Sequence, residues 1–224
     1  MGQALHHVRF TGFPEEALLF YEGLEADNSK AYWTDHREEY ERAVRAPMEA
    51  LLAGLEPEFG PAKFFRPYRD VRFSADKSPY KTHAGAVTGQ GHGLYVQMSA
   101  AGLMTAGGYY QMARDQLARY RTAVEDDRRG AALAGITSGL AEDGLTVAGD
   151  RLKRAPLGID AEHPRVDLLR YKGLYAYQQF PPARWLSTPK CLDKVADSWR
   201  RVIPLVEWLD REVGPPEAGA GEGR

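Results

Sequence analysis

Residues 82–110 read T-H-A-G-A-V-T-G-Q-G-H-G-L-Y-V-Q-M-S-A-A-G-L-M-T-A-G-G-Y-Y and carry the clearest β-strand pattern in the chain. Three short runs of small, β-branched and aromatic residues are separated by glycine-containing turns at 89–93 and 100–102. Runs of this length between such turns are typical of strands joined by hairpins. We therefore expect a meander of three antiparallel strands in the middle of the chain.

Helical patterns flank this strand block on both sides. Helices are predicted where apolar residues recur at helical spacing: residues 11–26, 28–55, 113–129, 131–142, 163–170 and 188–213. Two further strands are predicted at 145–152 and 173–180. Pro47 and Pro204 lie inside two of the helical patterns, where the proline ring and missing N–H should kink or divide a helix.

Helices first, antiparallel strands in the middle and helices last predict an α+β fold. We expect a single domain over residues 1–213, with a mainly antiparallel sheet packed by N- and C-terminal helices. A chain of 224 residues is long enough for one such core. Residues 214–224, G-P-P-E-A-G-A-G-E-G-R, have nothing to bury and are predicted to form a disordered tail.

Composition narrows the classes of function. The formal net charge is −2, so the chain as a whole gives no reason to expect DNA binding. No apolar run approaches the roughly 20 residues that span a bilayer, and no secretory signal is expected. The single cysteine, Cys191, suits a reducing compartment. We expect a cytoplasmic protein without a membrane partner.

A basic stretch precedes the strand block. Residues 63–83, K-F-F-R-P-Y-R-D-V-R-F-S-A-D-K-S-P-Y-K-T-H, carry six Lys or Arg and two Asp, a local balance of +4. Alternation predicts a strand in its first half, with Phe65, Val71 and Phe73 on one face, followed by a polar loop at 74–79. Arg69 falls on the apolar face, so it needs either a buried carboxylate partner or a bulge in the strand.

Three interpretations of the basic stretch remain open. In the first, the guanidinium groups of the arginines and the ammonium groups of the lysines bind a small anionic or phosphorylated ligand. The aspartates then orient these cations or transfer protons. Its candidate ligand-binding residues are Arg69, Asp70, Arg72, Asp76, Lys77, Tyr80 and Lys81. In the second, the arginines and aspartates form a structural ion-pair lattice with solvated lysines. In the third, the same segment is a non-catalytic module that contacts a protein or RNA partner. The pattern is compatible with an enzyme or with a binding protein.

Other chemistry is not indicated. The Lys-Ser and Lys-Thr pairs lack the preceding glycines of a phosphate loop, and G-Q-G-H-G at 89–93 precedes a strand rather than a helix. His83 and His92 could face each other across the meander, yet no metal-ligand spacing is present, and we expect no metal and no cofactor. Cys191 is interpreted as structural because no base accompanies it.

The motif R-D-V-R-F-S-A-D-K-S-P-Y-K-T, residues 69–82, resembles the hallmark of the bacterial and fungal domain of unknown function 2461 family, R-D-x-R-F-S-x-D-K-x-P-Y-K. The resemblance extends to the helix with Trp33 and Pro47, to G-G-Y-Y at 107–110 with the later L-A-R-Y-R, and to 152–172. One departure is Y-Y-Q-M at 109–112, where the family often has Trp and Pro. The resemblance implies a single α+β domain and no established activity.

Overall fold

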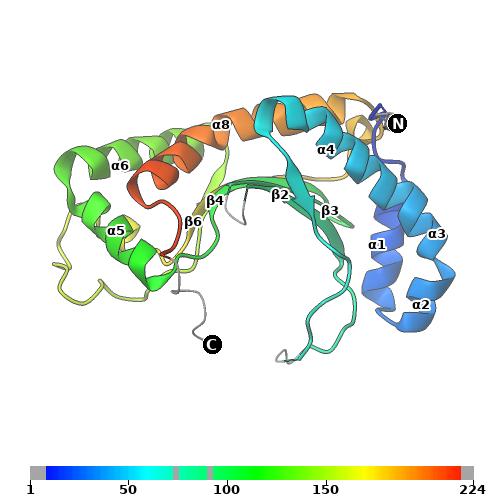
Figure 1. Cartoon of the computed structure of the whole chain (residues 1–224), viewed down its shortest axis with the longest axis horizontal. Helices are drawn as coiled ribbons and strands as arrows, with labels where there is room; N and C mark the ends of the chain where they lie inside the picture. The colour runs from blue at the N-terminus through cyan, green and yellow to red at the C-terminus, as the bar shows by residue number, and fades with distance from the viewer. Residues whose placement is uncertain (1–8, 73–75, 90–92, 218–224) are drawn as a thin grey trace, which may run out of the picture. The chain divides into compact units, whose positions relative to one another are not determined.

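The computed structural model describes residues 9–72, 76–89 and 93–217. Its strands form one six-stranded sheet in the order β1-β2-β3-β4-β6-β5 (Figure 1). They are β1 (Ala62–Phe64), β2 (His83–Thr88), β3 (Gly93–Ser99), β4 (Gly102–Tyr109), β5 (Thr146–Ala148) and β6 (Leu174–Phe180). The pairs β1–β2, β2–β3 and β5–β6 are antiparallel. The predicted meander and the α+β class with an antiparallel sheet are confirmed.

The helices follow the predicted apolar patterns. They are α1 (Glu16–Ala26), α2 (Lys30–Asp35), α3 (Arg37–Glu39), the π-helix η1 (Tyr40–Arg45), α4 (Ala46–Phe59), α5 (Arg114–Glu125), α6 (Asp127–Glu142), α7 (Val166–Leu169), the 3-10 helix η2 (Arg184–Ser187) and α8 (Lys190–Glu212). The apolar residues that recur at helical spacing from Trp33 to Leu55 form one stripe, and all of them are buried: Trp33, Tyr40, Val44, Met48, Leu51 and Leu55. Burial of this stripe, rather than intrinsic propensity, stabilises the run.

The two prolines inside helical patterns behave differently. Pro47 is the second residue of α4, where a missing N–H is tolerated, and the π-helical turn η1 directly precedes that helix. The helical backbone continues from η1 into α4 without a break, so Pro47 accompanies a change of helix type rather than an end of the helix. Pro204 lies inside α8, which continues past it to Glu212, so this proline does not divide the helix.

The chain divides into two compact units. Unit 1 comprises the described residues of 1–91, 95–105 and 179–197, and unit 2 those of 93–94, 106–178 and 198–217. The core of unit 1 includes Phe20, Met48, Leu51 and Met98. The largest buried side chains of unit 2 include Tyr120, Trp199 and Trp208. Each unit therefore has an apolar core of its own.

The predicted tail begins beside α5. Gln116 Nε2 donates to the Gly214 carbonyl at 2.7 Å, and the Glu217 N–H donates to Asp115 Oδ2 at 2.9 Å. Residues 218–224 of the predicted tail lie outside the described residues. Of the helices in the described part of the chain, none combines the length and the apolar character needed to cross a membrane.

Candidate functional site

The basic stretch forms a narrow two-stranded ribbon beyond β1 and β2 (Figure 1). We call its described residues, 65–72 and 76–83, the basic ribbon. Tyr68 pairs with Tyr80, the Arg69 N–H donates to the Pro79 carbonyl at 2.9 Å, and the Lys81 N–H donates to the Pro67 carbonyl at 2.8 Å.

The predicted strand over the first half of this stretch is wrong in extent. Regular pairing ends with β1 at Phe64 and returns only at the Tyr68–Tyr80 bridge. Pro67 and Pro79 have no N–H to donate, so a continuous ladder cannot form through the two segments. Of the three apolar positions expected on one face, Phe73 lies outside the described residues.

An asparagine and an aromatic cluster hold the basic ribbon against the helices of unit 1. Asn28 Nδ2 donates to the Tyr80 carbonyl at 3.0 Å, and the Tyr80 N–H donates to Asn28 Oδ1 at 3.1 Å. The Tyr80 ring stacks on Trp33 with centroids 4.4 Å apart. Tyr80, a predicted ligand-binding residue, is therefore buried at 5% exposure, whereas neighbouring Tyr68 is 48% exposed.

Two predicted site residues, Asp70 and Arg72, bind each other. Arg72 Nε lies 2.9 Å from Asp70 Oδ1, and an Arg72 terminal nitrogen lies 2.7 Å from Oδ2, which is a bidentate pair. The hydrogen bonds from Arg72 lower the pKa of Asp70 to about 2. Both side chains are exposed, and Asp70 stays ionised at neutral pH.

Three more predicted site residues make contacts inside the basic ribbon. Arg69 pairs with Asp76, which supplies the carboxylate partner that the sequence required for this arginine. Hydrogen bonds from Ser78, and then from Arg69, lower the pKa of Asp76 to about 2. Lys77 Nζ donates to the Val71 carbonyl at 3.0 Å. These pairings are those of the expected ion-pair lattice.

Lys81 differs from the other predicted cations. Its ammonium lies 5.1 Å from the centroid of the Phe65 ring, and no carboxylate of the described residues forms an ion pair with it. Burial, and then the charge of Arg66, lower its pKa. A lowered lysine pKa means that the surroundings disfavour the ammonium form.

His83 is the first residue of β2, two positions after Lys81, and was missed as a ligand-binding candidate. It is partly buried, and its pKa is lowered by burial first and then by the charges of Lys81 and Arg69. Its position directly after the basic stretch, only two residues from Lys81, was the available signal. His92, which could face His83 across the meander, lies outside the described residues.

Three cations and one histidine lie close together, and we call them the cationic cluster: Arg66, Arg69, Lys81 and His83. Only Arg69 has a carboxylate partner within the described ranges 9–72, 76–89 and 93–217. The basic ribbon therefore combines internally paired charges, Asp70 with Arg72 and Arg69 with Asp76, with a local excess of positive charge next to β2.

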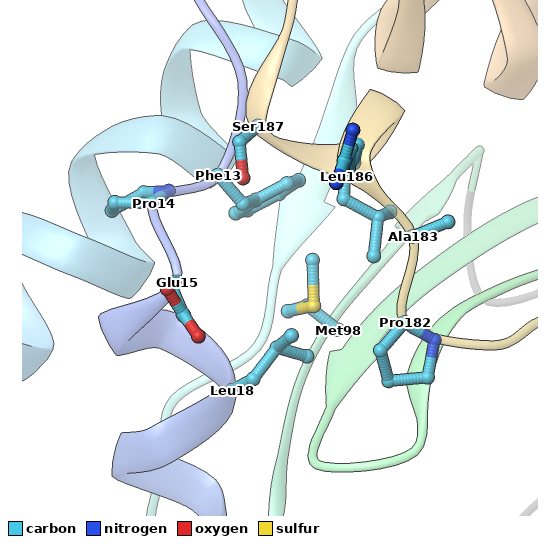
Figure 2. Close-up of a pocket in the computed structure, with 10 residues that line it drawn as sticks. Phe13, Pro14, Glu15, Leu18, Met98, Pro182, Ala183, Leu186 and Ser187 are labelled. Carbon is cyan, nitrogen blue, oxygen red and sulfur yellow. The ribbon is translucent and has the colours of Figure 1, made fainter.

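The best-defined cavity lies elsewhere in unit 1. It has a volume of about 370 Å³, and Figure 2 shows Leu18, Met98 and Leu186 pointing toward the hollow. None of the predicted site residues lines it; the lining is Phe13, Pro14, Glu15, Leu18, Met98, Pro182, Ala183, Arg184, Leu186 and Ser187. A more open hollow beside it is lined by residues of η2 and the start of α8.

Metal and thiol chemistry find little support in the described residues. No group of three His, Cys, Asp or Glu side chains there is arranged to hold a metal ion. Burial raises the pKa of the Cys191 thiol to about 12, so the thiol stays protonated at neutral pH. This cysteine fits the structural role that we expected.

Comparison with protein families gives one result. A family model described as "Conserved hypothetical protein (DUF2461)" matches residues 16–208. No curated protein and no solved structure matches the chain significantly. The match covers the whole basic ribbon and most of each unit.

Proposed function

We propose that this chain, which belongs to the DUF2461 family of conserved hypothetical proteins, binds a small anionic or phosphorylated ligand at the basic ribbon. One observation carries the proposal: Lys81 and His83, at the start of β2, lie close to Arg66 and Arg69, and only Arg69 has a carboxylate partner in the described part of the chain. Like charges held together disfavour one another, and a bound anion relieves this repulsion.

The candidate residues divide into two roles under this proposal. Lys81 offers three N–H donors, and Arg69 keeps N–H donors beyond the one that reaches Asp76. We assign direct anion contact to these two with Arg66 and His83. The other four, Asp70, Arg72, Asp76 and Lys77, bind one another or the backbone of the ribbon, and we assign them no contact with the anion.

The pKa values bear on whether a reaction follows binding. Asp70 and Asp76, with pKa values of about 2, are ionised at neutral pH and are poor proton carriers there. His83, with its pKa lowered below 6.5, is the residue of the cluster suited to accept a proton. The proposal is therefore a binding site first, with His83 as the proton acceptor if a reaction is catalysed.

The cytoplasmic location that we propose is supported by the single buried thiol of Cys191.

Isothermal titration with inorganic phosphate and pyrophosphate tests the proposal. Lys81→Met keeps the approximate length of the side chain but removes the charge. We expect it to weaken binding about tenfold or more, because it removes a charge-assisted hydrogen bond to the anion. The lowered pKa of Lys81 indicates that the fold disfavours its charge, so this variant should keep its melting temperature.

Arg72→Gln is the matched control, because Arg72 belongs to the same segment but is engaged by Asp70. Its affinity should stay within about twofold of wild type, as expected for an exposed ion pair. An equal loss in the two variants, or no binding of either anion to wild type, would refute the proposal.

The exposure of Tyr68 favours a second candidate, a module that contacts a protein or RNA partner. Tyr68 is 48% exposed and belongs to the same ribbon segment as Arg66. A partner recovered with wild type and lost with Tyr68→Ala, in a protein that binds no phosphate, would favour the module over the small-molecule site.

A further inference from the structure

The cationic cluster continues into a polar surface on one face of the β2–β3 pair. The register places His83 opposite Ser99, Gly85 opposite Gln97 and Val87 opposite Tyr95. Opposed residues and residues two apart share a face, so His83, Gln97 and Tyr95 lie on the same side of the sheet. Solvent reaches this face, because Gln97 and Tyr95 are partly exposed.

The alternation along β3 confirms which face is covered. Leu94, Val96 and Met98 point to the other side and are buried at 6%, 0% and 0% exposure. The side that carries Gln97 is therefore the one left for a ligand.

Only one of the two polar atoms of the Gln97 amide has a hydrogen-bond partner within the described residues. The Tyr95 hydroxyl donates to Gln97 Oε1 at 2.8 Å, and within the described ranges no residue bonds to the amide nitrogen. Polar groups on a partly buried surface usually have partners. One half of this amide is therefore available to a ligand.

Gly85 allows this arrangement. A Cβ atom at Gly85 would meet the Tyr95 hydroxyl, so only glycine lets the phenol lie over β2 while it bonds to Gln97. Burial raises the pKa of Tyr95 to about 12, so the hydroxyl keeps its proton at physiological pH. The orientation of the Gln97 amide is thus fixed by its neighbour.

The spacing suits one small ligand. His83 and Gln97 are diagonal neighbours across β2 and β3, so their Cβ atoms are about 7–8 Å apart. A ligand whose anionic group meets Lys81 and His83 would extend toward Gln97 along the sheet. A hydroxyl group fits there because it both donates and accepts hydrogen bonds.

We infer that the ligand is a phosphorylated compound with hydroxyl groups, such as a sugar phosphate or polyol phosphate, whose phosphate meets the cationic cluster and whose hydroxyl meets Gln97. This inference rests on the proposed function and adds the class of ligand. Gln97 is a binding residue in it, and Tyr95 and Gly85 are positioning residues.

Titration with glucose 6-phosphate, glycerol 3-phosphate, inorganic phosphate and glucose tests the inference. Wild type should bind at least one of the two phosphate esters more tightly than inorganic phosphate. Gln97→Leu should weaken that ester about two- to tenfold, the value of one hydrogen bond, and leave inorganic phosphate unchanged. Gly85→Ala should act in the same direction because it displaces the Tyr95 hydroxyl.

Gln179→Leu is the matched control: an exposed strand glutamine whose amide donates to the Ala101 carbonyl at 3.0 Å. It should leave all affinities unchanged. Esters that bind no more tightly than inorganic phosphate overturn the inference and leave the anion site intact. A Gln97→Leu variant that weakens both kinds of ligand equally also overturns it. Failure of every phosphate compound to bind overturns the proposed function as well.

Discussion

The pKa of His83 links the cationic cluster to the pH dependence of stability. Its imidazole lies next to Lys81 and Arg69, and burial and both charges lower its pKa from 6.5. A group whose pKa is lower in the folded state stabilises the fold above its unfolded pKa, and this contribution disappears as pH falls through the folded pKa. The neutral form of His83 should therefore stabilise the protein at pH 7 and above.

We predict that wild type loses more unfolding free energy between pH 7.5 and pH 5 than His83→Gln does. The glutamine is uncharged at both values, so the variant lacks the proton uptake of His83 on unfolding. Urea unfolding at several pH values measures the two slopes. Equal slopes would show that His83 is not held in its neutral form by the cluster.

Added phosphate separates this effect from general acid sensitivity. A bound anion raises the pKa of a nearby histidine, so phosphate should reduce the difference in slope between wild type and His83→Gln. If phosphate acts equally on both proteins, the anion does not bind close to His83.

Sequence reasoning predicted the charged residues of the site better than their partners. The excess of positive charge between Lys63 and His83 was visible from composition alone. That Arg72 pairs with Asp70, and Arg69 with Asp76 seven residues away, depends on how the ribbon folds back. Lys81 has no such partner among the described residues, and this could not be read from the sequence either.

At the scale of elements, Asn28 joins the basic ribbon to the start of α2. Its side chain makes the two hydrogen bonds to Tyr80 that a neighbouring strand would make. The next residue, Ser29, caps α2 by accepting from the Tyr32 N–H at 3.1 Å. The sequence predicted a helix that begins at Asn28, but nothing in it placed this side chain against a segment 52 positions away.

We predict that Asn28→Ala lowers the unfolding free energy by about 1–3 kcal/mol, because it leaves the N–H and carbonyl of Tyr80 without partners. The same variant should weaken phosphate binding, since Lys81 follows Tyr80 directly. Thermal denaturation and phosphate titration measure the two effects. Asn28→Asp, which keeps the acceptor and loses the donor, should lose less stability than the alanine variant. Unchanged stability in Asn28→Ala would show that the two hydrogen bonds between Asn28 and Tyr80 do not hold the basic ribbon in place.

The elements that the sequence predicted well are those whose burial follows one period. The stripe from Trp33 to Leu55 and the alternation of β3 are of this kind. The π-helical turn η1 and the early end of β1 were not predicted, because each depends on a proline and on neighbours distant in sequence. The regular spacing of apolar residues along the sequence does not predict structural changes of this kind.

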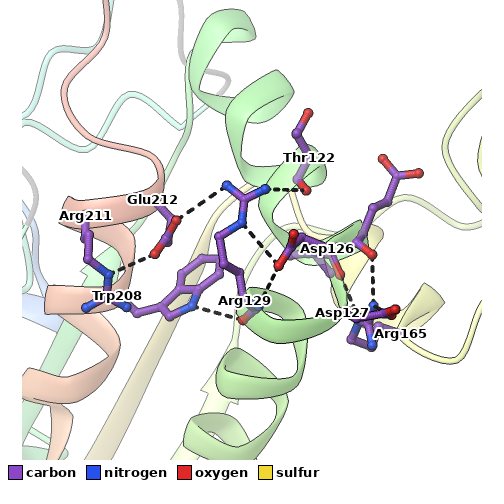
Figure 3. A network of polar contacts seen from close by, with 10 residues as sticks. Thr122, Asp126, Asp127, Arg129, Arg165, Trp208, Arg211 and Glu212 are labelled. Carbon is purple, nitrogen blue, oxygen red and sulfur yellow. Dashed lines mark hydrogen bonds and ion pairs between the residues drawn. The ribbon is translucent and has the colours of Figure 1, made fainter.

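Unit 2 has its own polar anchor, shown in Figure 3. Arg165 Nε donates to the Val124 carbonyl at 2.8 Å, and one of its terminal nitrogens donates to the Glu125 carbonyl at 3.0 Å. The Arg165 side chain is only 14% exposed. It satisfies carbonyl groups at the end of α5 that have no partner within that helix. Arg165→Ala should therefore lower the unfolding free energy by about 1–3 kcal/mol.

At the scale of the whole molecule, four elements belong to both units: β3, β4, β6 and α8. β4 contributes Gly102–Thr105 to unit 1 and Ala106–Tyr109 to unit 2, and α8 is divided after Asp197. The α+β class followed from the order of helices and strands along the sequence. The division into units did not, since it passes through the interior of continuous elements rather than through a linker.

The single domain predicted over residues 1–213 leads to a test of cooperativity with two matched variants, Asn28→Ala in unit 1 and Arg165→Ala in unit 2. A strand or helix that continues from one unit to the other cannot unfold in one without losing its pairing or packing in the other. Each variant should therefore lower the exchange free energy of backbone amides by the same amount in residues 95–99 of β3 and 174–178 of β6. Hydrogen exchange with mass spectrometry measures both segments in one sample. Loss of protection confined to the unit that carries the substitution would mean that the units unfold separately, and that the prediction of one domain is wrong.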